Sequence, residues 1–411
     1  MTTRALLPLL VSIGFAGAAA AQGFPGDPPV GAGGPTIVSV RQCNGNDPVP
    51  AIMGCTAIIT ARSSTPTQRS AALTNRGRAY LRRDQPDRAL ADFDQAIAID
   101  PMNSRGWANR ADFHQQQGEF DRALADYDRA IMANPMDFEA YSQRGNVRLI
   151  MGEPERAIPD YDQAIAVNPK FAAAFTNRGE AYRLQGEFDR AIGDFNQALM
   201  IDPRFATALD NRGIAYVEKG EFARGIADFD AALKIDPMMT IVYTHRAIAH
   251  AGNGARDRAL ADYDQAIKAD PSDPYVYLSR GNLLLEGGQF DRAIGDYDAA
   301  IMAERNYAEA FANRGVAYAR KGDFNRAVVD FDRAIMLDPS LPDLFANRGL
   351  SYVKTGQYAR AIADLDRALT NNPRDASSLY NRGVAKQQAG DRQGGDADVT
   401  RARSMDPTIG N

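Results

Sequence analysis

Proline recurs at a fixed interval along most of this chain. Neighbouring members of the series are 34 residues apart, except for one gap of 68 where Arg305 takes the missing place. A constant period of this length is typical of a solenoid, in which one supersecondary unit is stacked many times. The series consists of Pro101, Pro135, Pro169, Pro203, Pro237, Pro271, Pro339, Pro373 and Pro407.

The period divides residues 70–409 into ten repeats. Each is predicted to form two antiparallel helices, as residues 308–341 show most clearly: a first apolar stripe at helical spacing, a Gly-Asp pair at 322–323 that breaks the helix, and a second stripe before Asp338-Pro339. Neither helix can bury its stripe alone, so neighbouring repeats must stack. The repeats run over 70–103, 104–137, 138–171, 172–205, 206–239, 240–273, 274–307, 308–341, 342–375 and 376–409.

The sequence pattern of the repeat resembles that of the tetratricopeptide repeat family, over about four fifths of the chain. The resemblance implies an all-α fold, a right-handed α-solenoid of about ten antiparallel helix pairs, with a concave groove that binds a partner protein or extended peptide. The family pattern has a large residue in the first helix and a glycine four positions later, although Ala111 and Ala247 replace the glycine in two repeats. The large residues are Trp107, Phe175, Tyr243, Tyr277, Phe311 and Phe345, and the glycines are Gly77, Gly145, Gly179, Gly213, Gly281, Gly315, Gly349 and Gly383.

The first residues have the pattern of a secretory signal. Arg4 precedes an apolar stretch from Ala5 to Ala20, which an A-x-A site follows. We expect cleavage after Ala21 and a periplasmic or secreted protein, and the resemblance extends to secreted bacterial family members. The stretch is too short for a comfortable membrane span, and no later segment is long enough. Residues 22–36 are predicted to form a flexible Gly/Pro-rich leader, and residues 37–69 a helical N-terminal cap.

The cap contains both cysteines of the chain, Cys43 and Cys55. An even number at short spacing in an exported protein favours a disulfide bond between them. The alternative is two separate buried thiols.

Arginine and aspartate recur in phase with the repeat. Every repeat has an arginine at its seventh position and an aspartate sixteen residues later, as in Arg212 with Asp228 and Arg314 with Asp330. The planar guanidinium suits a carboxylate, so we predict structural ion pairs inside each repeat. A row of ligand-binding arginines is the alternative.

Asparagine recurs at the sixth position, which in resembling proteins faces the groove. A side-chain amide can donate and accept, so a row of amides matches the backbone of an extended peptide. An equally open alternative is that these residues only join neighbouring helices. The row consists of Asn75, Asn109, Asn177, Asn211, Asn313, Asn347 and Asn381.

Groove positions inferred from the family become apolar from the fifth repeat onward. They include Ile214, Leu278, Val316 and Leu350. Exposed apolar surface usually marks a binding site, so these residues are predicted to receive side chains of a bound segment. The alternatives are that tight superhelical packing closes this stripe, or that self-association covers it.

Charge and motifs narrow the function further. The net charge is −5, which disfavours nucleic-acid binding. No catalytic, metal-binding or cofactor-binding pattern is present, and the repeats leave little room for one. We therefore predict a non-enzymatic scaffold of the bacterial envelope that needs no cofactor and binds a protein or peptide. The alternative is a structural protein that self-assembles through its apolar C-terminal half.

Overall fold

A computed structural model of the protein describes residues 36–410, and these residues form helices and turns without a strand. The predicted signal sequence and most of the leader lie outside the described residues. The helices divide between two compact lobes, with the boundary between Pro237 and Met238. The architecture confirms the all-α solenoid predicted from the proline period.

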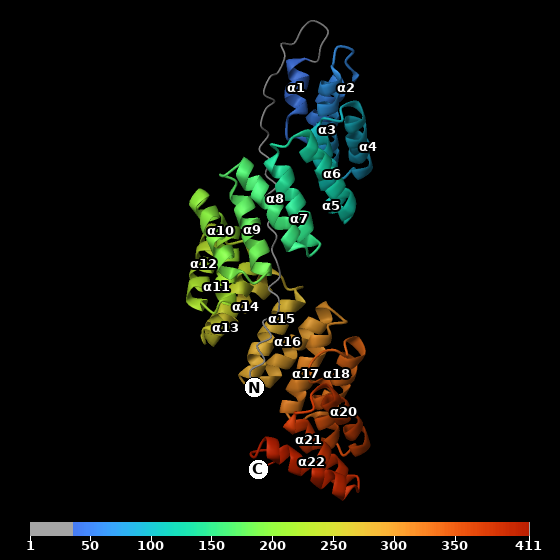
Figure 1. Ribbon diagram of the computed structural model, residues 1–411, viewed down its shortest axis with the longest axis vertical. Helices are drawn as coiled ribbons and strands as arrows, with labels where there is room; N and C mark the ends of the chain where they lie inside the picture. The colour runs from blue at the N-terminus through green and yellow to red at the C-terminus, as the bar shows by residue number, and fades with distance from the viewer. Residues whose placement is uncertain (1–35, 411) are drawn as a thin grey trace. The chain divides into compact units, whose positions relative to one another are not determined.

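The first lobe contains a pair of cap helices followed by helix pairs of the repeats (Figure 1). Its helices are α1 (Ile37–Cys43), α2 (Pro48–Thr60), α3 (Pro66–Leu81), α4 (Pro86–Ile99), α5 (Ser104–Gln116), α6 (Phe120–Ala133), α7 (Phe138–Ile150), α8 (Pro154–Val167), α9 (Ala172–Leu184), α10 (Phe188–Ile201), α11 (Ala206–Glu218) and α12 (Phe222–Ile235).

The second lobe continues the same alternation of first and second helices. Its helices are α13 (Ile241–Gly252), α14 (Arg256–Ala269), α15 (Pro274–Glu286), α16 (Phe290–Ala303), α17 (Ala308–Arg320), α18 (Phe324–Leu337), α19 (Leu344–Lys354), α20 (Tyr358–Asn371), α21 (Ala376–Gln388) and α22 (Arg392–Met405).

Two kinds of turn set the helix boundaries. Between the helices of a pair, a glycine such as Gly322 adopts a φ of 85°, a conformation that costs glycine little. After a second helix, the residue before the repeating proline leaves the helical region, as Asp202 does with φ −131° and ψ 96°. Glu304 has nearly the same conformation, φ −129° and ψ 101°, although Arg305 replaces the proline. The turn geometry therefore does not depend on every proline.

Close packing within each pair depends on the glycine of the first helix. Tyr161 and Phe229 of the second helices are fully buried, and each lies over the glycine of its own repeat. A methyl group added at Gly145 would lie 2.8 Å from Tyr161 Cε1, and one at Gly213 would lie 2.5 Å from Phe229 Cε1. The aromatic ring therefore fills the space that a side chain would need.

The first helices form the inner layer of each lobe. In the first lobe α7 contacts α9 and α9 contacts α11, and in the second lobe α15, α17 and α19 contact one another in sequence. Among the described residues, second helices of neighbouring repeats make no comparable contact. First helices of neighbouring repeats therefore lie closer together than second helices do. The surface that the first helices of a lobe share is called its inner face below.

Candidate functional site

Each repeated arginine forms an ion pair with the aspartate of its own repeat. Arg212 donates to both carboxylate oxygens of Asp228 at 2.7 Å, and Arg314 contacts Asp330 at 2.7 and 2.8 Å. The aspartate side chains are 10% and 5% exposed. The hydrogen bonds to Asp228 raise the pKa of Arg212. These arginines are thus held by the protein itself.

The same arginines also contact the preceding repeat, which the sequence analysis did not predict. Arg314 Nη1 donates to Asp298 Oδ1 at 2.6 Å, and Arg348 Nη1 to Asp332 Oδ1 at 2.6 Å. The outer aspartates are about half exposed. In most second helices a D-x-D pair thus serves two arginines, one from its own repeat and one from the next. This alternation is called the arginine ladder below.

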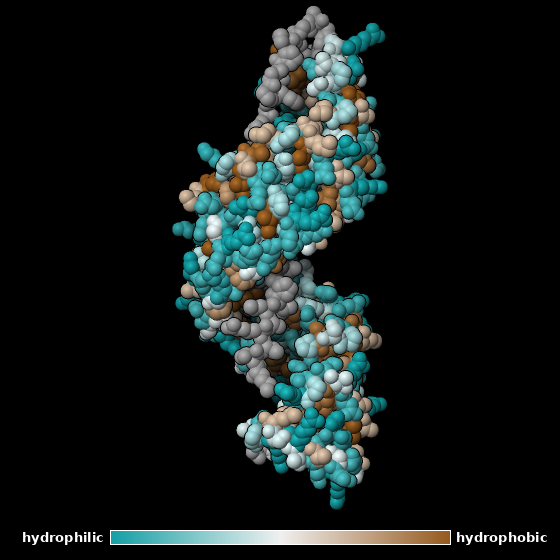
Figure 2. Space-filling view, viewed as in Figure 1, coloured by the Kyte–Doolittle hydropathy of each residue, from teal (hydrophilic) through white to brown (hydrophobic). Residues whose placement is uncertain are grey.

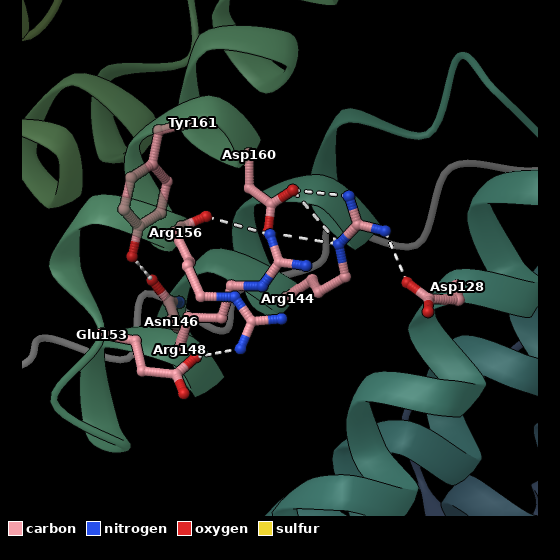
Figure 3. A network of polar contacts seen from close by, with 8 residues as sticks. All are labelled: Asp128, Arg144, Asn146, Arg148, Glu153, Arg156, Asp160 and Tyr161. Atoms are coloured by element: carbon pink, nitrogen blue, oxygen red, sulfur yellow. Dashed lines mark hydrogen bonds and ion pairs between the residues drawn. The ribbon is translucent and has the colours of Figure 1, made fainter.

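Figure 3 shows the ladder where it branches, around Asp160. Arg144 contacts Asp160 at 2.5 Å and reaches back to Asp128 at 2.6 Å. Arg148 also contacts Asp160, at 2.7 Å, and donates to the backbone oxygen of Arg156 at 2.9 Å. Arg148 occupies a position that tyrosine holds in several other repeats. A second cation therefore compensates the buried carboxylate here.

Some members of the asparagine row are part of the framework. Tyr161 donates to Asn146 Oδ1 at 2.8 Å, as Figure 3 shows. Asn177 Nδ2, in the next repeat, donates to the same oxygen at 2.8 Å. Asn75 makes the corresponding bond to Asn44 at 3.0 Å. These amides join neighbouring helices.

The arrangement recurs in the second lobe. Asn313 and Tyr297 both donate to Asn282 Oδ1, at 2.8 and 2.9 Å. Asn109 instead donates to the backbone oxygen of Arg105 in its own helix, at 2.7 Å. The bond between repeats forms where the preceding repeat supplies asparagine at its ninth position.

The side-chain amides of the other three members of the row have no hydrogen-bond partner within residues 36–410. Asn211 is 6% exposed, whereas Asn347 and Asn381 are half-buried. In the preceding repeats the ninth position holds Glu180, Val316 or Leu350 instead of asparagine. Asn347 and Asn381 are therefore the amides whose bonding groups remain available on an inner face.

The apolar residues predicted to line the groove also fall into two groups, buried and half-buried. Ile214 and Leu278 are 3% and 1% exposed, so the prediction that they receive ligand side chains is wrong for this conformation. Leu278 packs with Leu284, Ile294 and other core residues between neighbouring helices. Val316 and Leu350 are half-buried.

A hollow of about 300 Å³ opens beside Val316. It lies between the C-terminal end of α15, the start of α16 and the inner face of α17, with apolar walls and one charge of each sign. The lining residues are Leu285, Glu286, Gly288, Phe290, Val316 and Arg320. Its size and mixed lining suit a side chain better than a large organic ligand.

A carboxyl with a perturbed pKa lies on the inner face of the first lobe. Tyr127, which is fully buried, donates a hydrogen bond to Asp112. Burial raises the pKa of Asp112 to about 6, partly opposed by this bond and by Arg78, and Glu139 adds repulsion. Asp112 takes the place that Asn146 holds in the next repeat.

The described part of the chain shows no arrangement suited to metal chemistry or membrane insertion. No group of three His, Cys, Asp or Glu side chains among residues 36–410 could hold a metal ion. None of the helices described is both long and apolar enough to cross a bilayer. A disulfide joins Cys43 and Cys55.

Comparison with protein families agrees with the repeat architecture. Family profiles described as "Tetratricopeptide repeat" match residues 74–143, 142–206, 211–274, 262–295 and 314–378, and one described as "TPR repeat" matches residues 281–322. Together these matches span most of the chain. No curated protein matches it in sequence.

Several solved structures are similar to parts of the chain. A tetratricopeptide repeat protein from Parabacteroides merdae is 22% identical, with 60% of this chain and 98% of that chain covered and a TM-score of 0.49. YrrB, described as a TPR protein with an unusual peptide-binding site, is 25% identical, with 44% and 93% covered and a TM-score of 0.37. PilW, described as a type IV pilus biogenesis factor, is 21% identical, with 51% and 97% covered and a TM-score of 0.48.

Proposed function

Because the chain belongs to the tetratricopeptide repeat family, we propose that it is a non-enzymatic scaffold that binds an extended segment of a partner protein along the inner face of its second lobe. The hollow beside Val316 carries this proposal. An open apolar wall and an amide without a side-chain partner occur there in adjacent repeats.

The chemistry of this face suits a peptide. Asn347 follows Val316 by 31 residues, the same separation at which Asn313 contacts Asn282, so Asn347 lies next to Val316 across the junction of α17 and α19. Its amide offers a donor and an acceptor to a peptide backbone, while the hollow accepts a side chain of that peptide. Few charges take part, so binding should tolerate salt.

We place the protein in the bacterial envelope, in the periplasm or outside the cell. The support is the pattern of a signal sequence cleaved after Ala21 together with the Cys43–Cys55 disulfide, which oxidising compartments favour. A mass measurement of the exported protein tests this: retention of residues 1–21 would contradict it.

Site-specific photo-crosslinking tests the binding surface. A benzophenone amino acid at Val316 should capture a partner protein in cells, whereas one at Met302, which is 82% exposed on the second helix α16, should not. The variant N347A/N381A should reduce capture at position 316 several-fold without changing helix content. Equal capture at both positions would contradict the proposal, and capture of a second copy alone would favour self-assembly.

A further inference from the structure

A buried charged cluster lies on the inner face of the first lobe, far in sequence from the hollow described above. Arg183 of α9 donates to both carboxylate oxygens of Glu180, at 2.7 and 2.8 Å. Its Nη1 donates to Glu218 Oε1 of α11 at 2.6 Å. Glu180 and Arg183 are 5% and 7% exposed. The cluster links two neighbouring first helices, and the positions of Glu180 and Arg183 are apolar in most repeats of the second lobe.

The cluster carries one more negative than positive charge. Glu218 Oε2 has no hydrogen-bond partner within the described residues and no exposed surface of its own. Burial raises the pKa of Glu218 despite the nearby guanidinium, and Glu180 adds repulsion. A buried carboxylate that lacks a full set of donors is costly, so a further cation would stabilise this arrangement.

Neighbouring cations do not supply this charge. Lys219 contacts Asp189 at 2.6 Å and Glu221 at 3.1 Å, and Arg190 contacts Glu187 at 2.7 Å. The Glu218 side chain is 20% exposed. Its terminal torsion is broad, so the carboxylate can rotate to meet an approaching cation.

Exposed apolar side chains lie beside the cluster. Leu184, at the end of α9, is 46% exposed, and Ile150, at the end of α7, is 37% exposed. Ile150, Leu184 and Glu218 are separated by 34 residues each, so they occupy equivalent positions on three first helices. Met151, next to Ile150, is 38% exposed. These residues form one edge of the inner face, called the 150–218 edge below.

We propose that the 150–218 edge binds an extended protein segment in which two apolar residues are followed by a lysine or arginine. The apolar residues would cover Ile150 and Leu184, and the cation would contact the second oxygen of Glu218. The carbonyl ends of α7, α9 and α11 meet at this edge and also favour a cation. An acidic segment would instead be repelled.

The stacking of the helices predicts the spacing of the bound residues. First helices in contact lie about 10 Å apart, and an extended chain advances about 3.3 Å per residue. One repeat therefore corresponds to about three residues. The expected pattern is apolar, two residues of any kind, apolar, two residues of any kind, then Lys or Arg.

Selection from a displayed library of random twelve-residue peptides tests the proposal. Full-length protein is the target, and peptides whose binding N347A/N381A abolishes are assigned to the second lobe and set aside. The remaining peptides should be enriched in the pattern above. Enriched peptides without a basic residue three positions after the second apolar residue would overturn the proposal.

Variants then separate a binding role from a structural one. The affinity of the most enriched peptide should fall about tenfold in E218Q. Replacing the basic residue of that peptide by glutamine should weaken its binding to wild type and should not restore its binding to E218Q. E155Q, which removes an exposed carboxylate from α8, is the matched control and should leave the affinity unchanged. Arg183 keeps Glu180 in E218Q, so the fold should survive, as circular dichroism would show. Equal affinity of wild type and E218Q would overturn the proposal.

Discussion

Arg212 Nη1 donates a 2.6 Å hydrogen bond to Oδ1 of Asn196, a neutral amide. Every other repeat that is followed by a further repeat has aspartate at the position of Asn196. Arg178, one repeat earlier, contacts Asp162 at the same distance. Between neighbouring repeats, the ladder therefore has one step in which the outer partner carries no charge.

Replacing this amide by a carboxylate should strengthen the ladder. We expect N196D to stabilise the protein by about 0.5 kcal/mol, because the new pair with Arg212 is partly exposed to solvent. Thermal unfolding at low and high salt measures the effect, which salt should reduce. D162N, which makes the reverse change at Arg178, should destabilise by a similar amount. A gain in N196D that is independent of salt would contradict this explanation.

The inner pairs of the ladder should contribute much more. Removing Arg212 or Asp228 alone should destabilise by about 3 kcal/mol, because the remaining charge is left buried without its partner. The double variant should lose less than the sum of the single losses, as urea unfolding would show. Arg314 and Asp330 provide an independent test in the second lobe. An unchanged unfolding midpoint with lost ligand binding would show that these arginines bind ligand instead.

The ladder shows how far sequence reasoning reaches. The inner pair was predictable, because Arg and Asp recur sixteen residues apart in every repeat and an arginine at a packing position needs a partner. The outer aspartates, such as Asp332, recur with the same period. Residues two apart on a helix point in different directions, so the sequence of a single repeat shows no partner for these outer aspartates. Their partner lies in the next repeat, and only the stacking of repeats shows that Arg348 reaches them.

The amide row was harder to interpret for the same reason. Asn313 and Asn347 occupy equivalent positions, but Asn313 bonds Asn282, whereas the residue 31 positions before Asn347 is Val316, whose side chain has no acceptor. The neighbour 31 residues earlier decides the role, and this separation is not visible within one repeat. Burial of Leu278 likewise depends on how closely adjacent helices approach.

Asp112 should make stability depend on pH. Its pKa of about 6 in the folded protein exceeds the ordinary value of 3.8, so ionisation costs the folded state more than the unfolded one. Stability should therefore fall as pH rises from about 4 to about 6 and then level off. D112N removes the charge and keeps an acceptor for Tyr127, as Asn146 does for Tyr161. It should stabilise by about 1–3 kcal/mol at pH 7.

Melting temperatures of D112N and wild type between pH 4 and pH 8 measure this effect. The two proteins should differ least near pH 4, where Asp112 is protonated in the folded state and partly protonated in the unfolded state. N146D is the reciprocal variant and should lose stability at neutral pH more than at pH 4. A difference between D112N and wild type that stays constant with pH would rule out ionisation as its cause.

Two glycines should respond to alanine in opposite directions. Gly213 lies under Phe229, so G213A forces the ring to move and should destabilise by about 1–3 kcal/mol. Gly193, inside α10, has no atom within 4 Å of an added methyl group, and G193A should stabilise by about 1 kcal/mol through helix propensity. Urea unfolding compares them. Equal effects would show that the contact with Phe229 is not what requires glycine.

The disulfide should hold the first helix in place. Helix α1 has only seven residues and cannot persist alone, and Cys43 at its end is bonded to Cys55 of α2. The bond closes a loop with a sequence separation of 12, which should contribute about 3 kcal/mol to the stability of the cap. Because each repeat contacts mainly its neighbours, reduction should increase amide hydrogen exchange in residues 37–43 and leave α7 and later helices unchanged. The variant C43A/C55A should show the same exchange with and without reductant. If reduction instead raised exchange throughout the first lobe, the cap would be needed for the fold of the repeats and not only for its own.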